Sequence, residues 1–134
     1  MILTNKILQL ISAYICAICS FFLGDLNGLL KALIAFMIFD YLTGIWAAYK
    51  NKSLSSKIGA EGIAKKVYIL MLVSMANLLD TQVFGGSAVC RNAIIGFYIA
   101  NEGLSISENA VKIGVPVPKK FIDLLDQLKN KEDK

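Results

Sequence analysis

The chain has 134 residues, of which 56% are hydrophobic and 18% charged, with a mean hydropathy of +0.60. A soluble domain of this size needs a more polar surface, so the composition predicts that lipid surrounds most of the chain. The net charge is +4, and histidine, the usual general base at neutral pH and the commonest metal ligand, is absent. We therefore expect a non-enzymatic protein with no catalytic residue, no metal site and no cofactor.

Two apolar segments in the first half match the length of about 20 residues that a membrane-spanning helix needs. The first covers residues 7–24, and its apolar run is too long for a usual signal peptide, so we expect it to be retained. DLNG at 25–28 predicts a turn, and the second span covers residues 29–49. The C-x-x-C of Cys16 and Cys19 lies inside the first apolar run, which indicates helix packing rather than metal binding.

A basic segment, residues 50–66, follows the second span and is predicted to be a loop. Its Gly59 and Gly62 favour a turn, and Glu61 is its one acidic residue. Its lysines are Lys50, Lys52, Lys57, Lys65 and Lys66. Lysine-rich segments stay on the cytoplasmic side, where they attract anionic lipid headgroups. No base-reading motif accompanies them, so we expect no nucleic-acid partner.

A third span at 67–84 and a fourth at 87–104 are predicted around Gly85 and Gly86. Both carry polar residues, so three spans and one interfacial helix remain an alternative. Since the tail is also basic, an even number of crossings separates it from the loop, and both termini are predicted to be cytoplasmic.

The tail has two predicted helices. SISE at 105–108 fits a capping box that would start a short helix ending before Gly114. Residues 119–134 place four apolar side chains on one face, typical of an amphipathic helix lying on the membrane or on a partner subunit. The sequence thus predicts an all-α polytopic transmembrane protein with about four spans. Its membrane domain would cover residues 1–104, and an amphipathic helix would lie in a cytoplasmic tail, 105–134.

Four polar residues within the predicted spans are candidates for pore lining or assembly. An ionisable group near the middle of a membrane costs about 2.5–3.5 kcal/mol or more, so it usually faces other helices or water. Asp40 and Asn77 lie at similar predicted depths and are expected to meet, whereas Asp80 and Arg91 would pair nearer the outer end. Polar clamps that hold a bundle together are the alternative for Asp40, Asp80 and Arg91.

Small residues recur at helical spacing on three of the predicted spans. They are Ser12, Cys16, Ser20 and Gly24 on the first, Gly44 and Ala48 on the second, and Ala93, Gly96, Ala100 and Gly103 on the fourth. Such stripes let membrane helices approach closely. Because nearly every span has one, we expect a homo-oligomer in the lipid bilayer, although a tight monomer would use the same pattern.

Three stretches together resemble one known family: FDYLTGIWAAYKNKSLSSKIGAEGIAKK at 39–66, NEGLSISENAVKIG at 101–114 and VPVPKKF at 115–121. They are similar to the toxin-secretion and phage-lysis holins, which include bacteriophage holins and clostridial toxin-release proteins. The resemblance marks motif positions without assigning them chemistry. These are Asp40, Gly44, Lys57, Gly59, Gly62, Lys65, Lys66, Asn101, Glu102, Glu108, Asn109, Gly114, Pro116 and Pro118.

The resemblance implies a holin that oligomerises in the bacterial cytoplasmic membrane and forms lesions there. Such lesions release an endolysin, which leads to host cell lysis, or a large toxin, and neither cargo need bind the holin tightly. A small proton-coupled multidrug transporter using Asp40 is an alternative, but the first span lacks the acidic residue that such transporters carry. An accessory or immunity membrane protein is a further alternative.

Overall fold

The computed structural model describes residues 1–132, so the last two residues of the predicted tail lie outside it. The described chain is all-α, with no strand. Its helices are α1 (Ile2–Leu23), α2 (Gly28–Lys50), α3 (Ser56–Leu78), α4 (Val89–Ile113) and α5 (Lys119–Glu132), and a π-helical segment, η1 (Leu79–Val83), continues α3.

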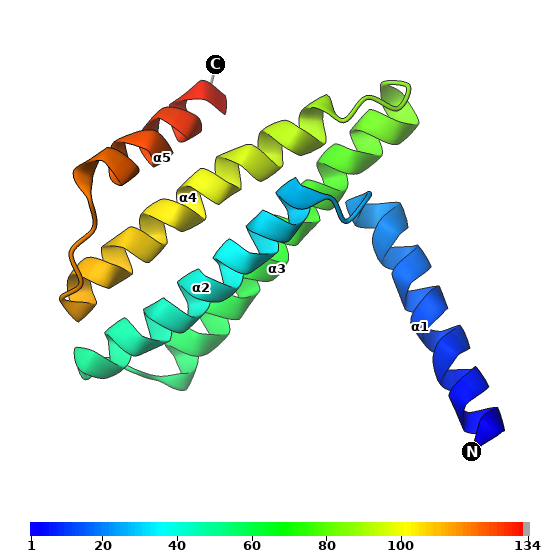
Figure 1. The fold of residues 1–134 in the computed structure, drawn as a ribbon, viewed down its shortest axis with the longest axis horizontal. Helices are drawn as coiled ribbons and strands as arrows, with labels where there is room; N and C mark the ends of the chain where they lie inside the picture. The colour runs from blue at the N-terminus through cyan, green and yellow to red at the C-terminus, as the bar shows by residue number, and fades with distance from the viewer. Residues whose placement is uncertain (133–134) are drawn as a thin grey trace.

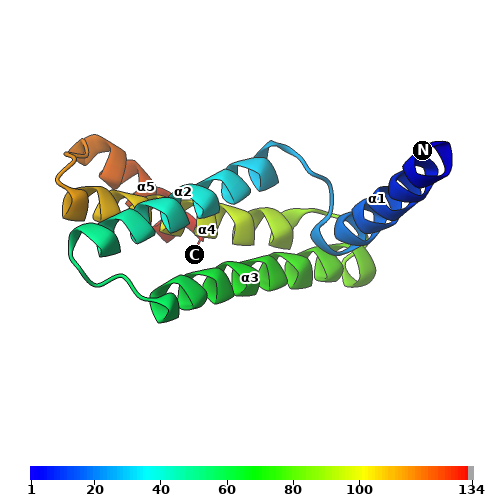
Figure 2. The same cartoon turned by 90° about the horizontal axis from the view of Figure 1, so that it is seen from below.

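Helices α2, α3 and α4 lie side by side and form a bundle (Figure 1, Figure 2). Successive helices run in opposite directions, so α2 and α4 are parallel and α3 is antiparallel to both. Helix α1 extends away from the bundle and contacts α3 near its own C-terminal end, and none of its residues is buried. Helix α5 turns back along α4.

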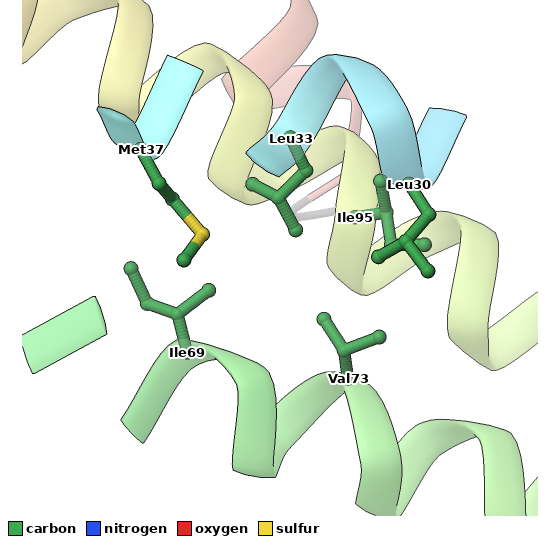
Figure 3. Packing of buried hydrophobic residues seen from close by; sticks show 6 residues of the cluster. All are labelled: Leu30, Leu33, Met37, Ile69, Val73 and Ile95. Atoms are coloured by element: carbon green, nitrogen blue, oxygen red, sulfur yellow. The ribbon is translucent and has the colours of Figure 1, made fainter. Parts of the chain in front are cut away.

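The bundle has a small apolar core to which all three helices contribute (Figure 3). Its members are Leu30, Leu33 and Met37 from α2, Ile69 and Val73 from α3, and Ile95 from α4. The outer faces of the same helices are also apolar, so in lipid the core is held by close packing rather than by exclusion of water.

By length and apolarity, three helical segments qualify as membrane spans: α1, α2 and the combined Ser56–Val83 segment of α3 and η1. Helix α4 is long enough but too polar to qualify. A fourth crossing by α4 therefore remains a prediction.

The predicted loop at 50–66 is wrong over most of its length, because α3 begins at Ser56. The Ser55 hydroxyl caps this helix by accepting a hydrogen bond from the Ile58 amide at 3.2 Å. Gly59 and Gly62 lie inside α3 against Tyr41 of α2, and a Cβ on Gly62 would stand 3.2 Å from the Tyr41 ring. These glycines serve close helix packing rather than a turn, so Lys57, Lys65 and Lys66 are helical.

The new helix predicted from SISE is also wrong, because α4 continues through residue 104 to Ile113. Ser107 is buried, and its hydroxyl donates to the Gly103 carbonyl at 2.9 Å, so it belongs to the helix interior. The predicted stop is confirmed, since Gly114 follows the helix with φ of 95°.

Helix α5 packs on α4 of its own chain, through Leu125. A Cβ on Gly103 would lie 2.9 Å from a Leu125 methyl group, so the absence of a side chain there lets the two helices touch. Leu125 is buried, whereas Phe121 and Leu124 are exposed. Part of the apolar face of α5 is therefore covered without a membrane or a partner subunit.

Candidate functional site

Buried polar side chains gather at two places in the bundle. The junction cluster comprises Asn77, Asp80 and Arg91, where η1 and α4 meet the end of α1. The ionic cluster comprises Asp40 from α2, Lys66 from α3 and Glu102 from α4. Each of its members lies about ten residues, or about 15 Å, from the bundle end formed by the C-terminus of α2.

In the junction cluster, Asp80 caps the N-terminus of α4. Its two carboxylate oxygens accept hydrogen bonds from the amides of Cys90 at 3.1 Å and Arg91 at 2.8 Å. These are early amides of α4, and Ala88 before them offers no side-chain acceptor. A carboxylate is also favoured at the positive end of the helix dipole.

Asn77 and Arg91 bind the opposite kind of helix end, the C-terminus of α1. The Asn77 amide donates to the carbonyls of Phe21 at 3.2 Å and Phe22 at 3.1 Å. The Arg91 guanidinium donates to the carbonyls of Leu23 at 2.8 Å and Asp25 at 2.5 Å. Carbonyls of a last helical turn have no partner within the helix, so this arrangement gives a purely structural reason for both side chains.

The expected proximity of Asp80 and Arg91 is therefore confirmed, but not as a charge pair, because Asp80 accepts from the Arg91 backbone. The expected contact between Asp40 and Asn77 is wrong. The predicted third span begins at Val67, whereas α3 begins at Ser56, so Asn77 lies much farther along the bundle than Asp40. Asn77 reaches α1 instead.

In the ionic cluster, the Lys66 ammonium forms salt bridges with both Asp40 and Glu102. The Glu102 side chain is 0% exposed, and those of Asp40 and Lys66 are each 12% exposed. Asn109 on α4 donates to the second Asp40 oxygen at 3.3 Å and to the Thr43 hydroxyl at 3.1 Å. The cluster therefore ties together all three helices of the bundle.

Close packing allows these helices to bring their charges together. A Cβ on Gly44 of α2 would lie 3.6 Å from the Asn109 amide nitrogen, and Gly62 touches Tyr41 one turn before Lys66. A cavity of about 210 Å³ lies beside the cluster and is lined by Asp40, Lys65, Lys66 and Asn109.

Two members of the ionic cluster are not predicted by the sequence to be partners of Asp40. The predicted cytoplasmic loop includes Lys66, and the family resemblance marks Glu102 as a motif position without a role. Extending the helical pattern of the third span back to Ser55 would have put Lys66 at the depth of Asp40. An acid at the same depth on the fourth span would then have been its second partner.

The small-residue stripes differ in how much the chain itself covers. On α4, Gly96, Ala100 and Gly103 are buried, with Ala93 partly so, and on α2 Ala48 is buried and Gly44 half-buried. On α1, Ser12, Cys16 and Ser20 are exposed, while Gly24 lies against the junction cluster. The stripe of α1 is thus largely unused within the chain.

Metal chemistry finds no support in the arrangement. In residues 1–132, no three Cys, Asp or Glu side chains are grouped so that they could hold a metal ion. Cys16 and Cys19 are exposed on α1, and Cys90 is partly buried on α4. What the ionic cluster can do is hold charges between helices, whereas the junction cluster binds backbone groups at helix ends.

Comparison with known proteins gives a consistent result. A sequence profile described as the bacteriophage holin family matches residues 17–130. A Clostridium perfringens protein, named as an uncharacterized 14.9 kDa protein in the nagH 3' region, is 45% identical over 103 residues, which are 77% of this chain and 78% of that protein. A Listeria monocytogenes protein, also named as uncharacterized, is 41% identical over 119 residues, 87% of this chain and 84% of its own. A Bacillus phage phi105 protein named "Probable holin" is 36% identical over 104 residues, 78% of this chain and 76% of its own. No solved structure matches the chain.

Proposed function

Because the chain belongs to the bacteriophage holin family, we propose that it acts as a holin. It accumulates in the bacterial cytoplasmic membrane, assembles with copies of itself and opens lesions through which a cytoplasmic endolysin or a large toxin leaves. The match over residues 17–130 carries this proposal. Family membership also points to a non-enzymatic membrane protein.

The state of α1 supports assembly. The bundle of α2, α3 and α4 buries its core without α1, and α1 itself has no buried residue. Its stripe of Ser12, Cys16 and Ser20 is exposed, and such stripes let membrane helices pack closely. In the proposed mechanism α1 contacts α1 of neighbouring copies, and the bundle moves with it.

The polarity of α4 supports a lesion lined by water. Arg91 and Glu102 are buried against the other helices in the single chain. Because these polar side chains face other helices and not lipid, α4 crosses the membrane as a fourth span in the proposed mechanism, although it is more polar than the other spans. On assembly the helices separate, and the ionic cluster becomes part of a wet surface.

Induced expression in bacteria tests the proposal directly. Growth is expected to stay normal and then stop abruptly as the membrane potential collapses, because lesions appear only after assembly. Lysis is expected only where an endolysin is co-expressed, since the lesion releases the hydrolase but does not cut the wall. A potential-sensitive dye and culture turbidity follow the two events separately.

Cells that express endolysin alone provide the control, and they should keep growing. If potential and viability persist at high membrane levels of the protein, the proposed function is wrong. A gradual change of internal pH that depends on an added substrate would indicate a transporter instead. Co-expression with a large fluorescent cargo then separates toxin-sized release from release of a small hydrolase.

A further inference from the structure

We propose that the ionic cluster is a proton-binding site, in which one proton is held between Glu102 and Asp40 while the bundle is packed. The proton comes from water, and the only bond that forms is the O–H bond of the carboxyl group. The inference concerns the single packed chain, so it does not depend on lesion formation.

The formal charges of the ionic cluster do not balance. Two carboxylates, Asp40 and Glu102, share a single ammonium, that of Lys66. If all three ionise, the cluster carries a net negative charge at a largely buried place, and a neutral Lys66 would only increase it. A buried charge without a counter-charge is costly, and a group in that position usually changes its protonation instead.

No other charged group balances the cluster among the described residues. Lys65 lines the adjacent cavity but is exposed and forms no salt bridge. From α5, the Lys129 ammonium lies 5.9 Å from the Phe97 ring centre, and the side chain that packs against Gly103, next to Glu102 in sequence, is the apolar Leu125.

The remaining titratable neighbours are tyrosines. They are Tyr98, one turn before Glu102 on α4, Tyr68 on α3, and Tyr41 on α2, which lines the cavity beside Asp40 and Lys66. A phenol carries no positive charge in either protonation state, so none of the three balances a carboxylate.

One carboxyl oxygen of the ionic cluster also has no hydrogen-bond partner. Glu102 Oε2 contacts Lys66, but Glu102 Oε1 is buried and has no hydrogen-bond partner. An ionised carboxylate accepts at both oxygens, as Asp80 does from two backbone amides. A protonated Glu102 carries an O–H group, and Asp40 contacts the same Lys66 ammonium, so one proton removes the excess charge and can be shared by the two carboxyl groups.

The site makes the packing of α2, α3 and α4 sensitive to pH. The packed bundle keeps a proton that an exposed glutamate in the unfolded chain would release at neutral pH. Because the folded state then binds more protons than the unfolded state, stability falls as the pH rises until this proton leaves.

Infrared spectroscopy of the full chain in detergent micelles tests the proposal. A protonated carboxyl group has a C=O stretching band that ionised carboxylates lack, and the band shifts in D₂O. At neutral pH exposed carboxyl groups are ionised, so the wild-type protein should show one such band. It should disappear as the pH is raised, together with a fall in the thermal unfolding temperature.

Four variants separate a shared proton from a merely structural cluster. Glu102→Gln and Asp40→Asn should each abolish the band, because either leaves one carboxylate balanced by Lys66. Lys66→Met should keep it, because two buried carboxyl groups then lack any cation. The matched control is Asp80→Asn, which removes a buried carboxylate that already has two donors and should leave the band unchanged.

Three outcomes would overturn the proposal. The first is the absence of the protonated-carboxyl band from the wild-type protein, and the second is persistence of the band in both Glu102→Gln and Asp40→Asn. The third is a wild-type protein that lacks the band and whose unfolding temperature rises with Na⁺ concentration at constant ionic strength. The last would mean that a metal cation, not a proton, neutralises the cluster. Circular dichroism checks folding, and if a carboxyl variant loses its helices, the pH dependence of the wild-type band alone decides.

Discussion

Gly24 shows how one residue joins α1 to the rest of the chain. Its backbone has φ of 77° and ψ of −165°, a region that residues other than glycine rarely adopt. A Cβ there would also stand 2.7 Å from the Asn77 side-chain oxygen and 2.8 Å from Arg91 Nε. Gly24 was predicted to belong to a packing stripe of the first span, and its contacts are with the junction cluster.

Gly24→Ala is expected to destabilise the protein for two reasons. The backbone conformation costs about 1–3 kcal/mol for a residue with a Cβ, and the clash with the junction cluster adds about 1–3 kcal/mol. Gly85→Ala is the matched control, because Gly85 has φ of 80° but open space around its Cβ position. Thermal unfolding in detergent, followed by circular dichroism, should show the larger loss for Gly24→Ala. Equal losses would mean that the close approach does not constrain the site.

The helices differ in how much of their packing surface is covered by other helices of the same chain. Helix α4 contacts α2, α3 and α5 and buries most of its small-residue stripe, whereas α1 reaches α3 only near its end. In α1, Cys16 lies on the exposed stripe, while Cys19 faces the groove between α1 and α3. The two cysteines can therefore report on different faces of one helix.

Oxidative cross-linking in membranes is expected to join copies of the protein through Cys16. Cys16→Ser should remove most of the disulfide-linked dimer, because the exposed stripe of α1 is the proposed contact between copies. Cys90→Ser should leave the dimer yield unchanged, since Cys90 is partly buried on α4. Non-reducing gels measure the yield. A dimer that survives Cys16→Ser at full yield would place the contact on another face.

In the molecule as a whole, the connection between α2 and α3 lies at the same end of the bundle as the C-terminus of α4. The Lys50 ammonium donates to the Ile113 carbonyl across this end. The lysines of the connection, Lys50 and Lys52, and those at the start of the tail, Lys119 and Lys120, lie at this end, whereas α5 runs back along α4 and places Lys129 5.9 Å from the Phe97 ring centre. The charge pattern predicts that this end is cytoplasmic, and the membrane crossing of α4 decides whether the connection and the tail share a compartment.

Labelling of single cysteines in intact cells tests this arrangement. In a chain lacking Cys16, Cys19 and Cys90, we expect Ser53→Cys and Lys120→Cys to resist a membrane-impermeant maleimide. Ser87→Cys, at the opposite end of the bundle, should react. If α4 crosses the membrane, Ser53→Cys and Lys120→Cys behave alike, and permeabilised cells should label all three. If both Lys120→Cys and Ser87→Cys react with the maleimide in intact cells while Ser53→Cys does not, the chain has three spans and an interfacial α4.

Much of the candidate site was within reach of the sequence. Asp40 was singled out because an isolated acid in an apolar run is conspicuous in any local pattern, and Asp80 and Arg91 were expected to pair because both lie near the outer ends of their predicted spans. Lys66 was missed as a partner because lysines and glycines before an apolar run also fit a cytoplasmic loop. The glycines fit a helix only when Tyr41 of α2 is seen against them.

Local composition alone was enough to establish an all-α membrane protein, the end of α2 near Lys50 and the stop after Ile113. Hydropathy, helix-terminating residues and charge asymmetry are local signals that extend over a few residues, so they can be recognised in the sequence. The tertiary structure decided where α3 begins and which side chains bind the carbonyls at the C-terminus of α1. It also decided that Asp40 lies in a cluster with Lys66 and Glu102 rather than beside Asn77. Those outcomes depend on groups far apart in sequence, because a buried charge is stabilised by whichever opposite charge the helix packing brings to it.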